Sequence, residues 1–309
     1  MHSDKILITG ASGVIGQALK KELEENGYSN VIALSSAHGD LRNEEQTMKI
    51  FQEVKPDVVY HLAARVYGIM GNMQNKGKAF IDNTRINTNV IDAAHQSGAR
   101  KVVAMGSSAI YSDSVTLPMT ENQVWNGAPH FSEAAYAHSK RAMLAQLEAY
   151  QAQYGLDFAF CISTNLYGPH DKFDEEWGHV LPSLISKFHR ATQEGSNVSV
   201  WGTGKARRDF LFGADAAYAM RLIGENYTGP INLATGHSQT IRETVELISK
   251  ISGLQGEVHW DASKPDGQNL RQYDVSKLAA LGFVPRHSLE EGLQKTYQWF
   301  AENTRIART

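Results

Sequence analysis

The 309-residue sequence predicts an α/β fold, in which a doubly wound parallel sheet is followed by a smaller C-terminal α/β domain. Three observations support this prediction. Short apolar segments alternate with helical ones through the first half, which is typical of a parallel sheet covered by helices. A glycine-rich turn follows the first apolar segment directly. After Pro169 the order of elements changes, which indicates a second domain.

The composition is that of an ordinary globular protein, with 42% hydrophobic and 20% charged residues. The net charge of -3, without any run of Lys or Arg, predicts no affinity for nucleic acid or an anionic membrane. The chain has no apolar stretch of about 18 residues, the length that a membrane span needs. Cys161 is the single cysteine, so no disulfide forms within the chain and we expect a cytoplasmic protein. The twelve histidines show no metal-ligand spacing, and we expect no metal site.

The first strand, over 5–8, and the turn after it predict a dinucleotide site. The turn reads Thr-Gly-Ala-Ser-Gly-Val-Ile-Gly over 9–16, and a helix follows to about Asn26. The first glycine permits a tight turn, the second lets backbone approach a pyrophosphate, and the third lets the helix pack on the strand. The helix N-terminus favours an anion. We therefore expect a Rossmann domain. Its expected cofactor contacts in this turn are Gly10, Ser12, Gly13, Val14, Ile15 and Gly16.

The residues after the second strand, over 30–34, bear on which dinucleotide binds. An NAD-selective site usually offers a carboxylate to the ribose 2′-OH, and an NADP site offers a cation. The residues directly after this strand include neither a carboxylate nor a Lys or Arg. The hydroxyls of Ser35 and Ser36, helped by His38, suit a 2′-phosphate. The sequence therefore favours NADPH and leaves NADH as the alternative.

Two further strands are expected to end at the same crevice. The third spans 58–62 and runs through Leu62 into Ala63 and Ala64, whose small side chains let a cofactor lie close. A helix over 83–95 comes next. The fourth strand, over 101–105, leads to Ser107. Ligands of an open parallel sheet bind beyond the carboxyl ends of its strands, so we expect the Ser107 hydroxyl to face a substrate oxygen.

A predicted helix over 132–154 carries Tyr136 and Lys140 four residues apart, which places both side chains on one face. A phenol ordinarily has a pKa near 10. A positive charge close by favours the phenolate and lowers the pKa. We therefore expect Tyr136 to act as a general acid or base with Lys140 beside it, and Ser107 to lie near both.

The C-terminal half is predicted to contain further helices over 181–192, 213–225, 240–251 and 288–303, with strands over 198–201 and 230–233. We expect the Rossmann domain to span 1–165, with late strands near 198–233 returning to its sheet. The smaller domain is expected to span 166–309.

The glycine turn, the serine after the fourth strand and the Tyr-x-x-x-Lys pair together resemble the extended short-chain dehydrogenase/reductases, which modify nucleotide sugars. More narrowly, the chain resembles the GDP-L-fucose synthases over nearly its whole length. The matching runs lie at 106–111, 118–119, 164–171, 179–180, 188–189, 200–204, 261–267 and 296–300.

This resemblance implies a reaction and its residues. Members of the family take GDP-4-keto-6-deoxy-D-mannose, invert C3 and C5, and reduce the C4 ketone with NADPH. Tyr136 would supply the proton to the C4 oxygen, Lys140 would hold the nicotinamide ribose, and Ser107 would stabilise the oxygen. His179 matches the family's histidine that transfers protons during epimerisation.

The resemblance also implies binding residues and a homodimer. Asp40 and Leu41 resemble a pair whose carboxylate meets the adenine amine, although Asp40 could instead cap the helix that begins near Asn43. A dimer of this kind would use helices over 84–97 and 133–154. The implied contacts to GDP and the sugar are Ser108, Asn165, Lys187, Trp201, Arg208 and Lys264.

One departure falls on the chemistry, because Ala109 stands where the family has a catalytic cysteine. A methyl group cannot remove a proton. Our hypothesis is therefore a C4 reductase of a GDP-4-keto-6-deoxy hexose or heptose without 3,5-epimerase activity. If Ser108, Asp113 or His130 replaced the cysteine, the enzyme would be bifunctional. A further alternative is a nucleotide-sugar 4-epimerase or dehydratase that recycles bound NAD. A non-enzymatic dinucleotide sensor would need none of the catalytic residues.

Overall fold

The computed structural model describes residues 3–67, 69–175, 178–264 and 270–308. Its centre is a six-stranded, all-parallel sheet in the order β2-β1-β3-β4-β5-β9. The chain crosses from β1 to β2 on one side and from β2 to β3 on the other, so the doubly wound sheet has its switch point between β1 and β3. The strands are β1 (Ile6–Thr9), β2 (Val31–Leu34), β3 (Val58–His61), β4 (Lys101–Met105), β5 (Asp157–Ser163) and β9 (Gly229–Leu233).

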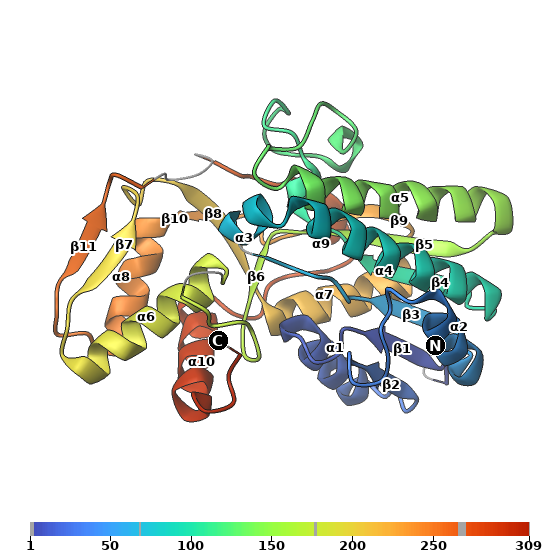
Figure 1. Ribbon diagram of the computed structural model, residues 1–309, viewed down its shortest axis with the longest axis horizontal. Coiled ribbons are helices and arrows are strands. Elements are labelled where there is room, and N and C mark those ends of the chain that lie inside the picture. Colours follow the sequence, from blue (N-terminus) through green and yellow to red (C-terminus); the bar gives the residue numbers. More distant parts are fainter. Residues whose placement is uncertain (1–2, 68, 176–177, 265–269, 309) are drawn as a thin grey trace.

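Helices cover both faces of this sheet and make two hydrophobic cores (Figure 1). On one face α1 (Val14–Glu25) packs against α7 (Gly213–Asn226). The other face carries α2 (Glu44–Val54), α4 (Lys76–Gln96) and α5 (Ala134–Tyr154). Most sheet strands are buried on both faces and read as continuous apolar runs, as parallel strands between two helix layers do. The predicted α/β fold is confirmed.

The smaller domain has its own core between two small sheets and three helices. One sheet has the order β10-β8-β6, and the other pairs β11 with β7. Its strands are β6 (Asn165–Tyr167), β7 (Val198–Trp201), β8 (Arg207–Phe212), β10 (Ser238–Thr240) and β11 (Val258–Asp261). Its helices are α6 (Val180–Glu194), α8 (Ile241–Ser252) and α10 (Leu289–Asn303), and Figure 1 shows them at one end of the molecule. Four short helices complete the described elements: α3 (Ile69–Gln74), η1 (Ser108–Ile110), η2 (Glu121–Gln123) and α9 (Ser276–Ala280).

We expect strands near 198–233 to return to the main sheet, and one strand of this range does so. Only β9 joins the sheet, beside β5, whereas β7 pairs with β11 in the smaller domain. The reason lies in burial. The inner residues of β9 are buried on both faces, as an inserted sheet strand requires, whereas β7 alternates buried and exposed residues and has one face in solvent.

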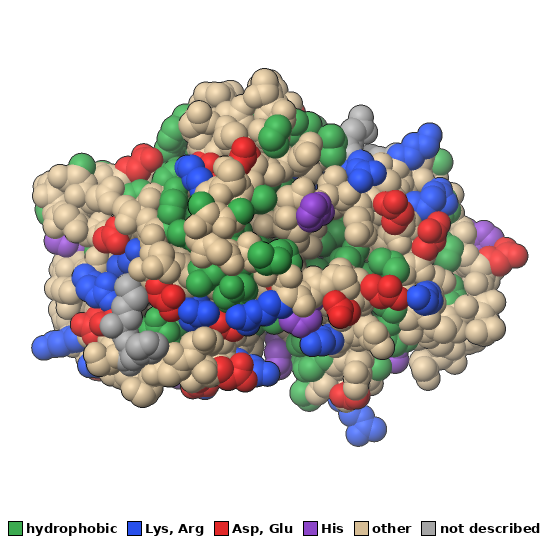
Figure 2. All heavy atoms as spheres, turned by 180° about the vertical axis from the view of Figure 1, so that it is seen from behind, with side chains coloured by type: hydrophobic (Ala, Val, Ile, Leu, Met, Phe, Trp, Pro, Cys, Tyr) green, Lys and Arg blue, Asp and Glu red, His purple; other side chains and the backbone are tan. Residues whose placement is uncertain are grey.

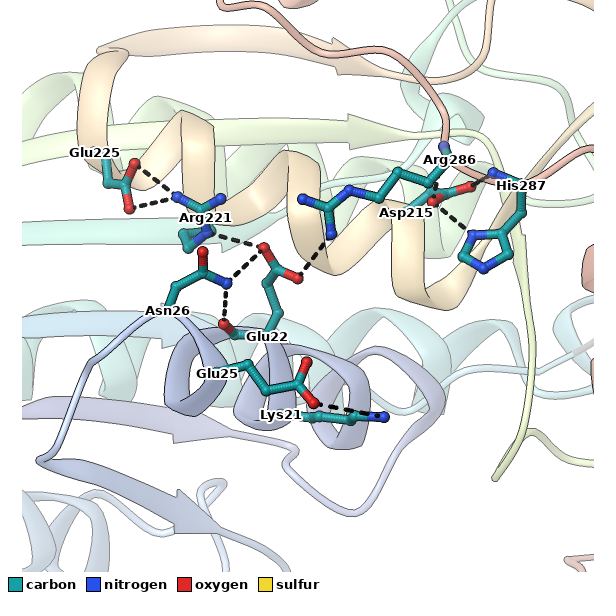
Figure 3. Close-up of polar contacts among 9 residues, drawn as sticks. All are labelled: Lys21, Glu22, Glu25, Asn26, Asp215, Arg221, Glu225, Arg286 and His287. Carbon is teal, nitrogen blue, oxygen red and sulfur yellow. Dashed lines mark hydrogen bonds and ion pairs between the residues drawn. The ribbon is translucent and has the colours of Figure 1, made fainter.

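Ion pairs fix the glycine-turn helix to the C-terminal segment (Figure 3). On α7, Arg221 Nε lies 2.9 Å from Glu22 Oε1 of α1, and Arg286 Nη1 lies 3.3 Å from the other oxygen of Glu22. One residue further on, His287 Nδ1 lies 2.9 Å from the buried Asp215 carboxylate at the start of α7. Because 286–287 lead directly into α10, this network positions the smaller domain relative to the Rossmann sheet.

The face opposite to that of Figure 1 carries interspersed positive and negative side chains, as the small net charge leads one to expect (Figure 2). Among the helices that the structure describes, none combines the length and the apolar character that crossing a membrane requires.

Candidate active site

The glycine turn forms a tight bend at the carboxyl end of β1. Gly10 has φ +71°, and a Cβ there would lie 2.7 Å from the backbone nitrogen of Ala63. A Cβ on Gly16 would lie 2.5 Å from the Cα of Ala11. Both glycines are therefore required by close backbone approach. Gly13 is the N-cap residue of α1, and its cap carries no side-chain hydrogen bond. Within the described chain, the first turn of α1 also lacks an acidic residue, so this helix N-terminus suits a phosphate.

The other predicted residues of the turn contribute through backbone rather than side chains. Ile15 is buried in the core between α1 and the sheet. Val14 packs against Gly168 and Gly213, where an added Cβ would lie 3.1 Å from its Cγ2. Ser12 is exposed beside them. The turn therefore offers main-chain N–H groups of the kind that cradle a pyrophosphate.

The residues predicted to bind the adenosine part of the cofactor follow β2. They lie next to the glycine turn, because Ala11 N–H donates to the Leu34 carbonyl at 3.0 Å. Ser35 Oγ and His38 Nδ1 lie 3.1 Å apart in a compact turn. Ser36 is exposed in the same turn. These hydroxyls remain a proposed site for a 2′-phosphate.

Asp40 does not cap the following helix. Asn43 does so, since its side-chain oxygen accepts from Gln46 N–H at 2.9 Å. The Asp40 carboxylate instead accepts from the side chain and the backbone N–H of Arg42, which lower its pKa to about 2. The capping interpretation is wrong because Asn43 stands next to the first helical residue. Leu41 packs against the sheet core, and its carbonyl accepts from α2 and α4.

A buried polar chain links the end of β3 to Asn87 on α4, and Asn87 Nδ2 donates in turn to the Ser139 carbonyl of α5 at 3.4 Å. Thr9 Oγ1 accepts from the backbone N–H groups of Leu62 and Ala63 and lies 2.8 Å from His61 Nδ1. His61 Nε2 lies 3.1 Å from Oδ1 of Asn87 on α4. Burial, and then the charge of the nearby Lys140, lower the pKa of His61 to about 3. The imidazole is therefore neutral, with Nε2–H donating to Asn87. Ala64, which follows Ala63, is half-buried.

Ser107, Tyr136 and Lys140 meet where β4 ends against α5. The Ser107 hydroxyl lies close enough to the Tyr136 phenol to lower its pKa. The Lys140 ammonium lies 5.8 Å from the centre of the Tyr136 ring and donates to the Met105 carbonyl at 2.8 Å. This is the arrangement expected from the sequence: a phenol and an ammonium from one helix face beside the serine that follows the fourth strand.

The electrostatics at Tyr136 differ from the expectation that Lys140 lowers its pKa. Burial raises the pKa of Tyr136 above its ordinary value, the Glu133 carboxylate raises it further, and the nearby Ser107 hydroxyl lowers it. Lys140 is only 1% exposed, and burial lowers its own pKa to about 7. The physical cause is desolvation, which disfavours the charged form of both groups.

Behind Ser107 lies a cluster that sequence reasoning missed. Ser108, expected to contact the substrate, is buried and accepts from Nη1 of the buried Arg271 at 3.2 Å. Arg271 Nη2 lies 3.8 Å from a carboxylate oxygen of Glu133, one helical turn before Tyr136. Ala109, within η1, is only 3% exposed. No local pattern reveals Arg271, because it stands 163 residues from Ser108.

His179 lies at the N-cap position of α6 and is exposed. Burial raises the pKa of Asp171, and the proximity of His179 lowers it by less. Among the described residues, Asp171 Oδ2 has no hydrogen-bond partner, while Oδ1 accepts from the Lys172 backbone N–H.

Three predicted substrate residues from distant parts of the chain gather in the smaller domain. Trp201, at the end of β7, is 50% exposed. The ammonium of Lys187 on α6 lies 5.6 Å from a Trp201 ring centre, and that of Lys264, just after β11, lies 5.5 Å from one. Two cations beside an exposed indole suit a ligand that combines a diphosphate with a ring. Part of the matching run over 261–267 lies outside the described residues.

The two adjacent arginines of β8 point to opposite faces of the strand. Arg207 turns towards β10, where its Nε lies 3.3 Å from Ser238 Oγ. Arg208, the predicted contact, therefore lies on the other face, and its Nη1 donates to the Arg207 carbonyl at 2.9 Å. Asn165 on β6 donates to the Asp209 carbonyl at 3.1 Å, which fixes its side chain beside β8.

Comparison with known proteins gives consistent matches over the whole chain. The family model described as "NAD dependent epimerase/dehydratase family" matches residues 6–234. A GDP-L-fucose synthase of Escherichia coli (strain K12) is 38% identical over 315 residues, covering 98% of each chain. The predicted resemblance is confirmed.

Solved structures of related enzymes resemble this chain both in fold and in sequence. The chain superposes with TM-score 0.92 on a GDP-L-fucose synthetase from Naegleria fowleri bound to NADP, at 31% identity over 99% of this chain and 96% of that one. It superposes equally well, at 0.92, on a GDP-6-OMe-4-keto-L-xylo-heptose reductase from C. jejuni, at 27% identity over 98% and 99% of the two chains.

Proposed function

We propose that this chain, which belongs to the NAD dependent epimerase/dehydratase family, is an NADP-dependent oxidoreductase that reduces the 4-keto group of a GDP-sugar. More finely, we propose a GDP-4-keto-6-deoxy hexose or heptose as substrate and no 3,5-epimerase activity. Support comes from relatives of both kinds, because a GDP-L-fucose synthase and a GDP-keto-heptose reductase match nearly the full chain.

The finer proposal rests on one observation. Position 109, two residues after Ser107, carries only the buried methyl group of an alanine. Inversion of C3 or C5 needs a base on one face of the sugar and an acid on the other. Ala109 supplies neither. The reduction group of Ser107, Tyr136 and Lys140 is assembled beside it.

Reduction requires a hydride at C4 and a proton on the oxygen. The residues of the glycine turn would hold NADPH, which supplies the hydride when bound. Tyr136 then gives its phenolic proton to the C4 oxygen, and Ser107 donates a hydrogen bond to the same oxygen. Lys140 binds the nicotinamide ribose and balances the charge on Tyr136 once the proton has left. His179 binds a sugar hydroxyl.

The GDP part of the substrate is proposed to bind at Trp201, Lys187 and Lys264. Lys187→Ala and Lys264→Ala are each expected to weaken GDP binding about tenfold, because each removes one cation from a partly desolvated diphosphate site. Isothermal titration with GDP measures this. Lys250→Ala, on the exposed side of α8, is the matched control and keeps native affinity. Equal affinities in all three variants would contradict the assignment.

We also propose a homodimer formed through α4 and α5. Both helices are long and lie side by side, and Phe80, Ile81 and Tyr154 are exposed on them. A molar mass by light scattering near twice 34.2 kDa decides between this assembly and a monomer.

The test of function is NADPH consumption with GDP-4-keto-6-deoxy-D-mannose in D2O, followed by NMR of the product. We expect oxidation of NADPH without deuterium at C3 or C5. Deuterium at both carbons would show a bifunctional enzyme, with another base in place of the family cysteine. Turnover without net NADPH consumption would indicate a 4-epimerase or dehydratase that recycles NAD. If only a heptose analogue reacts, the substrate is the heptose.

A further inference from the structure

The Ser107 hydroxyl is held in place by the short helix that follows it. Ser107 is the N-cap residue of η1, and its Oγ accepts from the Ala109 backbone N–H at 3.2 Å. The Ser107 carbonyl accepts from the Ile110 N–H, also at 3.2 Å. A hydroxyl that accepts a hydrogen bond still has its own hydrogen to donate. The position of η1 therefore determines where Ser107 presents its hydroxyl to a substrate oxygen.

Two consecutive cations of α5 hold the backbone on either side of Ser107. Lys140 Nζ donates to the Met105 carbonyl, two residues before Ser107, at 2.8 Å. Arg141 donates to the Ile110 carbonyl, three residues after Ser107, from Nε at 3.0 Å and from Nη2 at 2.7 Å. Both cations belong to the helix that carries the proposed acid. The serine loop is therefore tied to this helix at two points.

Arg141 also holds a further segment of the chain. Its Nη1 donates at 2.9 Å to the carbonyl of Gly127, which lies between η2 and α5. An antiparallel bridge between Ser112 and Pro129 closes this segment next to Gly127. One planar guanidinium thus binds carbonyls from two separate segments at once. The compact ammonium of a lysine does not reproduce this fixed fork of donors.

Burial indicates that Arg141 serves this attachment. The residue is only 8% exposed, and the hydrogen-bond acceptors that the structure describes for its guanidinium are the Ile110 and Gly127 carbonyls. Taking a cation out of water is costly, and a buried charge is a poor means of stabilising a fold. The better account of this side chain is therefore what it fixes, which is the place of η1 against α5.

We propose that Arg141 is a positioning residue for the reduction. By fixing the Ile110 carbonyl to α5, it sets the Ser107 hydroxyl at the place from which Ser107 and Tyr136 reach the same substrate oxygen. Arg141 itself acts through Ser107 and contacts neither the sugar nor the cofactor. The inference deepens the proposed function and rests on it, since it takes Ser107 and Tyr136 to act on the C4 oxygen.

The test is a double-mutant cycle on kcat for NADPH-dependent reduction of GDP-4-keto-6-deoxy-D-mannose. Arg141→Gln is expected to lower kcat about 10- to 100-fold, because a small displacement of a catalytic group costs up to about 10²-fold. The KM of the sugar and the Kd of NADPH should stay near native. In the Ser107→Ala background, Arg141→Gln is expected to change kcat by less than about twofold, because the hydroxyl that it misplaces is already absent. Arg141→Lys, which keeps the charge and one donor group, should retain part of the lost kcat.

A loss of kcat that is equally large with and without the Ser107 hydroxyl overturns the proposal, since a general structural effect does not depend on that hydroxyl. A native kcat in Arg141→Gln overturns it too. If Arg141→Gln fails to fold, as circular dichroism would show, the same cycle with Arg141→Lys decides.

The matched control is Arg100→Gln. Arg100 directly precedes β4, at the end of that strand opposite to Ser107, and its side chain pairs with Asp4. This variant should keep the native kcat in both backgrounds.

A second measurement separates this inference from the proposed substrate. Hydrogen exchange followed by NMR monitors the Ala109 and Ile110 amides, which are bonded to Ser107, without any sugar. Faster exchange of both amides in Arg141→Gln, while the central amides of α5 stay protected, supports the inference even if the tested GDP-sugar is not turned over. Unchanged exchange overturns it even if turnover is normal.

Discussion

Tyr136→Phe is expected to lower kcat for NADPH-dependent reduction by about 10²–10⁴-fold, the usual contribution of a positioned general acid. The substitution keeps the ring near the start of α5 and removes only the hydroxyl that lies near Ser107. NADPH binding should remain close to native, because the glycine turn and Lys140 are untouched. Single-turnover kinetics at saturating NADPH measure the chemical step directly.

The matched control for this variant lies on the same helix. Tyr150→Phe removes a hydroxyl that donates to Asp92 at 2.9 Å, far from the proposed chemistry. Its kcat should stay near the native value. If Tyr136→Phe also kept its kcat, the proton would have to come from another group, and the assignment of Tyr136 as the acid would be wrong.

Ala109→Cys is expected to give an enzyme that exchanges deuterium into C3 and C5 of the sugar in D2O while it still reduces C4. The native methyl group cannot remove a proton, whereas a thiol close to the reacting carbons can. His179 would then protonate the opposite face. NMR of the product detects the gain, for which the native background is expected to be zero.

Ala109→Ser is the control for steric effects, because it adds an atom of similar size whose hydroxyl is too weak an acid or base at neutral pH for this exchange. Both variants enlarge a buried position, so thermal unfolding must show that each is folded. A folded, reducing Ala109→Cys enzyme without exchange would mean that the missing cysteine is not sufficient to explain the absence of epimerisation. Exchange by the native enzyme would remove the basis of the proposal.

Local sequence predicted the parts of the fold that backbone sterics control. The glycine turn is an example, since a Cβ atom added at Gly10 or Gly16 would collide with nearby backbone. The spacing of Tyr136 and Lys140 is another, because a helix always places residues four apart on one face. Features of the fold that depend on burial were predicted less completely. The helix to which 83–95 belong extends back to Lys76, and β7 lies outside the main sheet, where only one of its faces is covered.

The sequence by itself determined which chemical groups are present: a glycine-rich turn, the Ser107 hydroxyl, the Tyr136 phenol, the Lys140 ammonium and a methyl group at position 109. Tertiary structure decided how those groups behave. It half-buried Tyr136 and buried Lys140, so that desolvation raises the pKa of the phenol and lowers that of the ammonium, and it brought Arg271 to Ser108 and Glu133. The physical reason is range: helix and turn geometry act over a few residues, whereas burial and ion pairing depend on contacts that only the folded chain creates.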